Sequence, residues 1–290
     1  MRTVAPSGLL GPLLAATAPG EALVRRLPRP RDAVRQAEGL GRRSHRPWPL
    51  PDGPWLQGQT WRDLLFAHWR VPHEPLRAGV PPEIPIDTFD GSCWLGITPF
   101  EITGLRPRGG LPPPGISRFP EVNVRTYATI GGKPGISFLS LEAASALAVA
   151  TGRGVYGLPY RRPAMRIERE DGAVRFWSRR TTREGTVVEL EVTYRPRGPA
   201  VVPRPRTLEH FLTERYCLYT LGPGRRIHRA DIHHPPWPLR LAEAVFERNT
   251  MALPYGLDVA EQPDLLHHAH RQDVVIWPPS PLDGEGGPER

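Results

Sequence analysis

Three polar side chains alternate along one short segment, FPEVNVRTY at residues 119–127. If this segment is a strand, Glu121, Asn123 and Arg125 share one face. A guanidinium and an amide can bind a small anionic or carbonyl compound, and a carboxyl group can exchange a proton with it. The same alternation is typical of a sheet whose polar side lies in water. The pattern therefore leaves open whether this face lines the inside of a small barrel or is solvated.

A second segment, GRGVYGLPYRR at residues 152–162, adds two candidates. The Tyr160 hydroxyl can donate a hydrogen bond or a proton, and Arg161 keeps a fixed charge whose planar fork suits a carboxylate. The candidate catalytic residues are therefore Glu121 and Tyr160, and the candidate ligand-binding residues are Asn123, Arg125 and Arg161. The alternative is that these side chains satisfy one another in a buried polar network without catalysis.

Other residue types offer less chemistry. His267, His268 and His270 lie close together, but no His-Glu-x-x-His pair or cysteine set accompanies them, so we expect surface or packing histidines and no metal site. Lys133 is the single lysine, and it lies in a glycine-rich turn where we expect it to be solvated. The chain has no Gly-Lys-Ser/Thr phosphate loop and no Gly-x-Ser-x-Gly elbow. We therefore expect no cofactor.

The composition limits the class of protein. The chain has 290 residues, 39% of them hydrophobic, with 37 prolines and 29 glycines, which favours short strands and turns. No apolar run is long enough for a membrane-spanning helix. The two cysteines, Cys93 and Cys217, exclude a disulfide-rich scaffold and fit a reducing compartment. We therefore expect a cytoplasmic protein without membrane attachment.

Basic charge is concentrated at the amino terminus. The net charge is +8, and residues 1–50 hold nine arginines against three acids. We predict a disordered Arg/Pro/Gly-rich leader over residues 1–47, a single domain over residues 48–280 and a flexible tail over residues 281–290. Because a basic arm can bind phosphates without reading sequence, weak nucleic-acid binding through the leader is one alternative function.

The number of strands and helices expected from the sequence predicts a mainly β domain, a barrel or sandwich with a few helices. Helices are expected over residues 61–69, 141–151 and 208–214, capped by Thr60, Ser140 and Thr207. Strands are expected over residues 93–105, 121–130, 135–139, 165–170, 173–179, 186–194, 216–221 and 274–277. Residues 239–246 fit either a helix or a strand.

Six segments resemble one known family, the YqjF-like family of the acetoacetate decarboxylase-like superfamily. They are FAHWRVP (66–72), DTFDG (87–91), NVRTY (123–127), GISFLSLE (135–142), FLTERY (211–216) and HPPWPL (234–239). The resemblance implies a central antiparallel β-barrel or cone with flanking helices and a ligand cavity. Residues 152–161 are also similar to the superfamily signature, a Gly-Arg-Glu-x-Trp-Gly-Phe-Pro run followed by two lysines.

The resemblance also limits the expected chemistry. In that superfamily the first lysine forms a Schiff base and the second lowers its pKa, whereas Tyr160 and Arg161 stand at these positions here. Glu121 matches the superfamily's strand carboxylate. Because tyrosine cannot form an imine, we expect a protein that binds a small carbonyl or carboxylate ligand. If it is an enzyme, we expect a lyase-like activity without a Schiff base. The alternative is a non-catalytic structural or interaction protein with a filled barrel.

Overall fold

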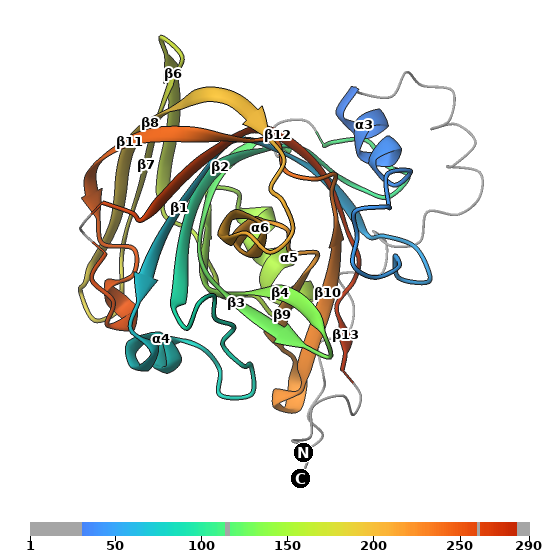
Figure 1. The fold of residues 1–290 in the computed structure, drawn as a ribbon, viewed down its shortest axis with the longest axis horizontal. Helices are drawn as coiled ribbons and strands as arrows, with labels where there is room; N and C mark the ends of the chain where they lie inside the picture. Colours follow the sequence, from blue (N-terminus) through green and yellow to red (C-terminus); the bar gives the residue numbers. More distant parts are fainter. Residues whose placement is uncertain (1–30, 114–116, 260–261, 283–290) are drawn as a thin grey trace, which may run out of the picture.

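Seven strands form a closed ring at the centre of the protein (Figure 1). The structure is a computed structural model that describes residues 31–113, 117–259 and 262–282. Within these residues, thirteen strands form one mixed sheet in the order β13-β10-β9-β4-β3-β2-β1-β12-β11-β8-β7-β6, with β5 beside β4. Pairing of Ile232 with Ile276 and of His233 with Val275 joins β10 to β12 and closes the ring. The mainly β barrel prediction is confirmed.

The ring consists of β1 (Gln57–Val71), β2 (Cys93–Pro107), β3 (Phe119–Ile130), β4 (Lys133–Ala143), β9 (Cys217–Leu221), β10 (Ile227–His233) and β12 (Leu265–Ile276). The strands outside it are β5 (Tyr160–Arg161), β6 (Ala164–Glu170), β7 (Ala173–Thr181), β8 (Val187–Val201), β11 (Leu239–Asn249) and β13 (Ser280–Pro281). The helices are α3 (Arg31–Gly39), α4 (His73–Gly79), α5 (Ala146–Tyr156) and α6 (Leu208–Thr213). Figure 1 shows α6 inside the ring and α3 outside it.

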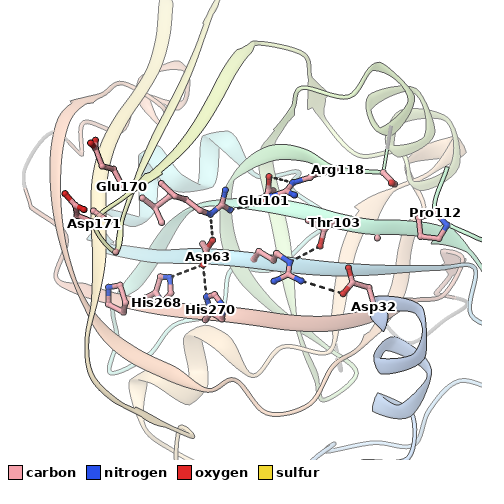
Figure 2. Close-up of a pocket in the computed structure, with 18 of the residues that line it drawn as sticks. Asp32, Asp63, Glu101, Thr103, Pro112, Arg118, Glu170, Asp171, His268 and His270 are labelled. Carbon is pink, nitrogen blue, oxygen red and sulfur yellow. Dashed lines mark hydrogen bonds and ion pairs between the residues drawn. The ribbon is translucent and has the colours of Figure 1, made fainter. Parts of the chain in front are cut away.

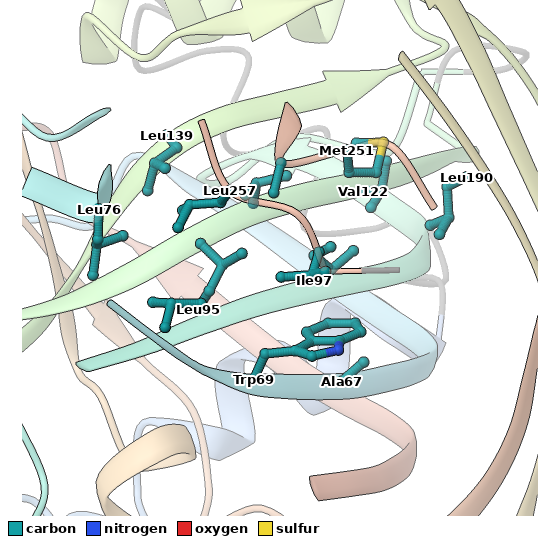
Figure 3. Packing of buried hydrophobic residues seen from close by; sticks show 14 of the residues in the cluster. Ala67, Trp69, Leu76, Leu95, Ile97, Val122, Leu139, Leu190, Met251 and Leu257 are labelled. Atoms are coloured by element: carbon teal, nitrogen blue, oxygen red, sulfur yellow. The ribbon is translucent and has the colours of Figure 1, made fainter. Parts of the chain in front are cut away.

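The main apolar core lies between the ring and the outer strands β8 and β7. Figure 3 shows Trp69, Ile97 and Val122 from the ring strands packed with Leu190 of β8 and with Met251, which follows β11. Each of these five side chains is at most 4% exposed. The ring strands therefore bury their outer face in this core and their inner face inside the ring.

The prediction of a helix over residues 61–69 is wrong, because this stretch lies in the middle of β1. Trp61, Leu64, Leu65 and His68 have helical spacing, but burial on both faces of a strand also removes the polar–apolar alternation that identifies a half-exposed strand. A break in the β1–β2 register between Arg62 and Ala67 obscures the strand period further.

The helix predicted over residues 141–151 begins later than expected. Strand β4 continues to Ala143, and Ser145 caps α5 by accepting a hydrogen bond from the Ala148 backbone N–H. The other short helix forms as predicted, with Thr207 as the cap of α6. The ambiguous stretch over residues 239–246 is part of strand β11.

Residues 31–47 pack against the ring, which differs from the disordered leader predicted there. Gln36 is 1% exposed, donates a hydrogen bond to Thr60 Oγ1 at 3.2 Å and accepts one from Arg106 Nε at 2.8 Å. Arg46 donates to the backbone oxygen of Ile232. These partners lie far along the chain, so local composition does not reveal them. The rest of the predicted leader, residues 1–30, and most of the predicted tail lie outside the described residues.

None of the helices in the described part of the chain has the length and apolar character needed to cross a bilayer.

Candidate functional site

Strand β3 directs Glu121, Asn123 and Arg125 toward the inside of the ring. Their exposed fractions are 4%, 6% and 6%. Arg125 Nη2 donates a hydrogen bond at 3.4 Å to the backbone oxygen of Leu212 in α6, which lies inside the ring. The alternating Val122 lies in the apolar core on the other face (Figure 3). The polar face of this strand is therefore buried and not solvated.

The side chain of Tyr160 meets Glu121 across strand β4. Its hydroxyl donates to the Glu121 carboxyl group, with the two oxygens at 3.2 and 3.3 Å. Strand β4 lies between them, since its Ala143 pairs with Glu121 on one side and its Leu141 pairs with Tyr160 on the other. The contact joins the two candidate catalytic residues, which are 39 positions apart in the sequence.

The turn after α5 places the Tyr160 ring. Gly157 ends the helix with a left-handed φ of 63°, which a glycine adopts without steric cost. A Cβ on Gly152 would lie 2.3 Å from two ring carbons of Tyr160, so the close approach of the ring requires glycine there. The Arg153 guanidinium donates to the Tyr160 backbone oxygen at 2.6 and 2.9 Å and holds the strand that follows.

Burial changes the protonation of this pair. It raises the pKa of Glu121 to about 8, and the hydrogen bond from Tyr160 opposes that rise only in part. Burial, together with the neighbouring Glu121, raises the pKa of Tyr160 well above its ordinary value. Near pH 7 the site therefore holds a mostly protonated carboxyl group beside a neutral phenol, an arrangement suited to giving a proton or a hydrogen bond to a carbonyl oxygen.

Arg125 is a buried cation without a carboxylate partner among the described residues. Its guanidinium carbon lies 5.2 Å from the ring centre of Phe66 and 5.9 Å from that of Tyr127, and its Nε has no hydrogen-bond partner. Burial lowers the pKa of His68, and the positive charge of Arg125 lowers it further. Because Glu121 is mostly protonated near pH 7, it does not neutralise this charge.

Further polar atoms on the same interior face lack partners in the described structure. They include Asn123 Oδ1, Thr98 Oγ1 and Trp237 Nε1, all buried. Thr98 pairs with Asn123 across β2 and β3, and Trp237 packs edge-on against Phe66 at 4.8 Å between ring centres. The sequence alone does not identify Thr98 or Trp237 as site residues. Thr98 reaches the site through the pairing of β2 with β3, and Trp237 through the packing of residues 234–239 against the ring. The unpartnered atoms show that this polar network is not self-satisfied.

Arg161 is not brought together with the other four candidates. In the parallel pairing of β5 with β4, Tyr160 lies beside Leu141 while Arg161 lies beside Glu142, on the opposite face. Arg161 is exposed and donates to the backbone oxygen of Tyr160. Lys133 lies opposite Ile130 at the turn end of the β3–β4 hairpin and is half-buried, not fully solvated as expected.

The remaining sequence motifs are a histidine cluster and a glycine-rich segment. Among the described residues, no three His, Cys, Asp or Glu side chains are placed to hold one metal ion. Gly152, Gly154 and Gly157 have the Gly-x-Gly-x-x-Gly spacing of a dinucleotide loop. They lie at the end of α5, however, and not in a turn that leads from a strand into a helix. This placement does not fit pyrophosphate binding.

The ring with its outer strands has the acetoacetate decarboxylase-like fold. It is similar to the enduracididine biosynthesis enzyme MppR complexed with pyruvate, with a TM-score of 0.56 and 13% identity over 83% of this chain and 93% of that one. It is equally similar to acetoacetate decarboxylase from Legionella pneumophila, with a TM-score of 0.56 and 11% identity over 82% of this chain and 93% of that one. At these identities the likeness shows the fold alone.

The chain belongs to the DUF2071 family, described as an uncharacterised conserved protein, whose family model matches residues 58–273. It is 42% identical over 229 residues to the uncharacterised protein YqjF of Bacillus subtilis strain 168, which covers 79% of this chain and 93% of that protein. The YqjF-like resemblance seen in the sequence is confirmed.

Proposed function

We propose that the inside of the ring binds a small compound that carries both a carboxylate and a carbonyl group. The observation that carries this proposal is the buried Arg125 guanidinium, which has no carboxylate partner in the described residues. A buried charge without a counter-ion is costly, and an anionic ligand supplies one. The carboxylate of the ligand therefore binds Arg125, and Asn123 adds a polar contact beside it.

Glu121 and Tyr160 bind the carbonyl end. They share the interior face with Arg125, and four residues of extended strand separate Glu121 from Arg125 by roughly 13 Å between backbones. The two side chains reach toward the ligand from either end of this span. The protonated Glu121 and the Tyr160 hydroxyl donate to the carbonyl oxygen, and Glu121 accepts or releases a proton when the carbon next to the carbonyl reacts. Any catalysis follows acid–base chemistry, because the chain has no lysine at this site.

Pyruvate is the first probe to use. The similar fold of MppR has been solved with pyruvate and with a condensation product of pyruvate and imidazole 4-carboxaldehyde. Pyruvate and acetoacetate carry both groups that the proposal requires, and acetone carries only the carbonyl.

Thermal unfolding of the full chain in the presence of these three compounds tests the proposal. A ligand at 100 times its Kd stabilises the protein by about 2.7 kcal/mol, which for this size raises Tm by roughly 5–10 °C. We expect this rise with pyruvate or acetoacetate and none with acetone. An equal rise with acetone would contradict the role of Arg125, and no rise with any of the three would contradict the proposal.

A second candidate function is a non-catalytic interaction protein with a filled ring. The aromatic packing inside the ring favours it, since Trp61 stacks on Trp237 at 6.0 Å and packs against Phe100 at 5.6 Å. This candidate predicts that none of the oxo acids binds.

A further inference from the structure

A groove of about 920 Å³ lies on the outside of the ring, apart from the interior site. The outer faces of β1, β2 and β12 and the β6–β7 hairpin line it (Figure 2). Glu101 lines the groove, whereas its neighbour Phe100 pairs with Glu121 on the interior face. Since successive residues of a strand point to opposite sides, the sheet separates the groove from the interior site.

Asp63 occupies the centre of the groove in an unusual backbone conformation. Its φ of 49° is left-handed, a region that Asp and Asn enter more readily than most residues. The Tyr194 hydroxyl donates to its backbone oxygen at 2.6 Å and fixes this conformation. The Asp63 side chain is 10% exposed and accepts a hydrogen bond from Arg169 Nε at 2.7 Å.

Asp63 also orients an exposed histidine. His270 Nδ1 lies 2.9 Å from Asp63 Oδ1 and donates to it, so in the neutral imidazole Nε2 is an acceptor. The His270 side chain is 73% exposed, and its Nε2 has no partner in the described part of the chain. The buried His268 lies behind it at 3.9 Å from Asp63, with Nδ1 unpartnered. The Asp63–His270 pair has the arrangement of a carboxylate that aligns an imidazole for a ligand.

Arg118 and Arg169 lie beside this pair, and each guanidinium donates hydrogen bonds to carboxylates through its Nε and Nη2 atoms. Glu101 accepts hydrogen bonds from Arg118 at 2.8 and 3.0 Å and from Arg169 at 2.9 Å. Both guanidinium groups use Nε and Nη2 in these contacts with Glu101 and Asp63, and the Nη1 atoms have no partner among the described residues. The two side chains are 66% and 36% exposed. A guanidinium held in this way is positioned to bind a planar or tetrahedral anion with its free edge.

The other acids of the groove do not occupy these free edges. Asp32 is paired with Arg62 and Arg271. Glu170 and Asp171 lie at the hairpin end of the groove, away from Arg118 (Figure 2). Asp63 and Glu101 are themselves paired with Arg169 and Arg118.

We infer that the groove binds a second small molecule, which carries a carboxylate or phosphate group held by Arg118 and Arg169 and a hydroxyl group that donates to His270 Nε2. This site does not depend on the interior site, because the two lie on opposite sides of the sheet. The ligand class is a hydroxylated small anion, such as a sugar phosphate fragment or a hydroxy acid.

Isothermal titration of the full chain with glycerol 3-phosphate, inorganic phosphate and putrescine tests this inference. We expect glycerol 3-phosphate to bind more tightly than inorganic phosphate, which lacks the carbon-bound hydroxyl, and putrescine not to bind. Arg118→Gln and His270→Gln change exposed side chains, and each is expected to weaken glycerol 3-phosphate binding at least about ten-fold. Arg197→Gln is the matched control, because Arg197 is another exposed arginine paired with a glutamate, Glu243, outside the groove.

The outcomes separate this inference from the proposed function. Glu121→Gln is expected to leave glycerol 3-phosphate binding unchanged, since it alters only the interior site. Binding that survives both Arg118→Gln and His270→Gln would overturn the inference. Tighter binding of putrescine than of either anion, or no binding of either anion at millimolar concentration, would overturn it as well.

Discussion

The Glu121 carboxyl group and the Tyr160 hydroxyl lie 3.2 Å apart, although 39 positions separate them in the sequence. Strand β4 stands between them and fixes both neighbours through its register. The contact places a carboxyl group with a pKa of about 8 beside a neutral phenol inside the ring.

Replacing Glu121 with glutamine should change how stability depends on pH. The folded-state pKa of about 8 is above the ordinary value near 4.5, so between these values the folded state binds a proton that the unfolded state has lost. Wild-type stability therefore falls by up to about 1.4 kcal/mol per pH unit from about pH 5 to pH 8 through this group. Glu121→Gln removes this loss. Chemical denaturation at pH 5 and pH 8 should show that the free energy of unfolding falls less between these pH values for the variant than for the wild type. An equal fall in both proteins would contradict the assigned pKa.

Tyr160→Phe should raise the pKa of Glu121 further. The hydroxyl of Tyr160 donates to the carboxylate and opposes the effect of burial, so its removal leaves burial alone. We expect a loss of about 1 kcal/mol in unfolding free energy near neutral pH. The pH at which Glu121 titrates, followed by carboxyl-carbon NMR, should move upward in this variant, and a downward movement would show that the hydrogen bond does not act on the charged form.

Gly152→Ala should disturb the position of Tyr160. The added methyl group would lie 2.3 Å from the tyrosine ring, and such overpacking costs about 1–3 kcal/mol. Gly154→Ala is the matched control in the same helix, because a Cβ there meets nothing within 4 Å and should stabilise the helix by about 0.5–1 kcal/mol. Thermal unfolding of both variants gives the comparison. Equal effects of the two substitutions would rule out a packing role for Gly152.

Gln36→Ala should destabilise the protein although Gln36 lies within the predicted leader. The substitution removes one hydrogen-bond partner of the buried Arg106, at 2.8 Å, and the hydrogen bond to Thr60. We expect a loss of about 1–3 kcal/mol. Arg35→Ala, one residue earlier on the exposed side of α3, should change stability by less than about 0.5 kcal/mol. Identical stabilities for the two variants would mean that α3 does not contribute to the fold in solution.

Part of the arrangement of the candidate residues follows from the sequence. Strand alternation is sufficient to place Glu121, Asn123 and Arg125 on one face, because the side-chain period of a strand is two. The family resemblance connects Glu121 with Tyr160. The resemblance adds Arg161 because it stands at the position of the superfamily's second lysine, but the period of two places neighbouring residues of a strand on opposite faces.

Other features depend on long-range packing that no local pattern reveals. Strand β1 has both faces buried, so its apolar residues match a helical spacing as well as a strand. Thr98 joins the site only through its pairing with Asn123, and Trp237 only through its packing on Phe66. The groove around Asp63 combines residues from strands that are more than two hundred positions apart in the sequence, such as those of Asp63 and His270.

We infer that the buried charge of Arg125 serves a ligand and not the fold. Arg125→Met keeps an unbranched side chain against Phe66 and removes the charge. Because a buried charge without a counter-ion is costly, the variant should be as stable as the wild type or more stable in the absence of ligand. Arg161→Ala, on the opposite face, is the control that should bind as the wild type does.

The most direct measurement is a calorimetric titration of pyruvate into the wild type, Arg125→Met and Arg161→Ala, with the stability of each protein determined alongside. We expect binding to the wild type and to Arg161→Ala, and binding at least roughly thirty-fold weaker to a stably folded Arg125→Met. Unchanged pyruvate binding in Arg125→Met would contradict a ligand-binding role for Arg125. So would an Arg125→Met protein that loses several kcal/mol of stability without ligand, because Arg125 would then serve the fold.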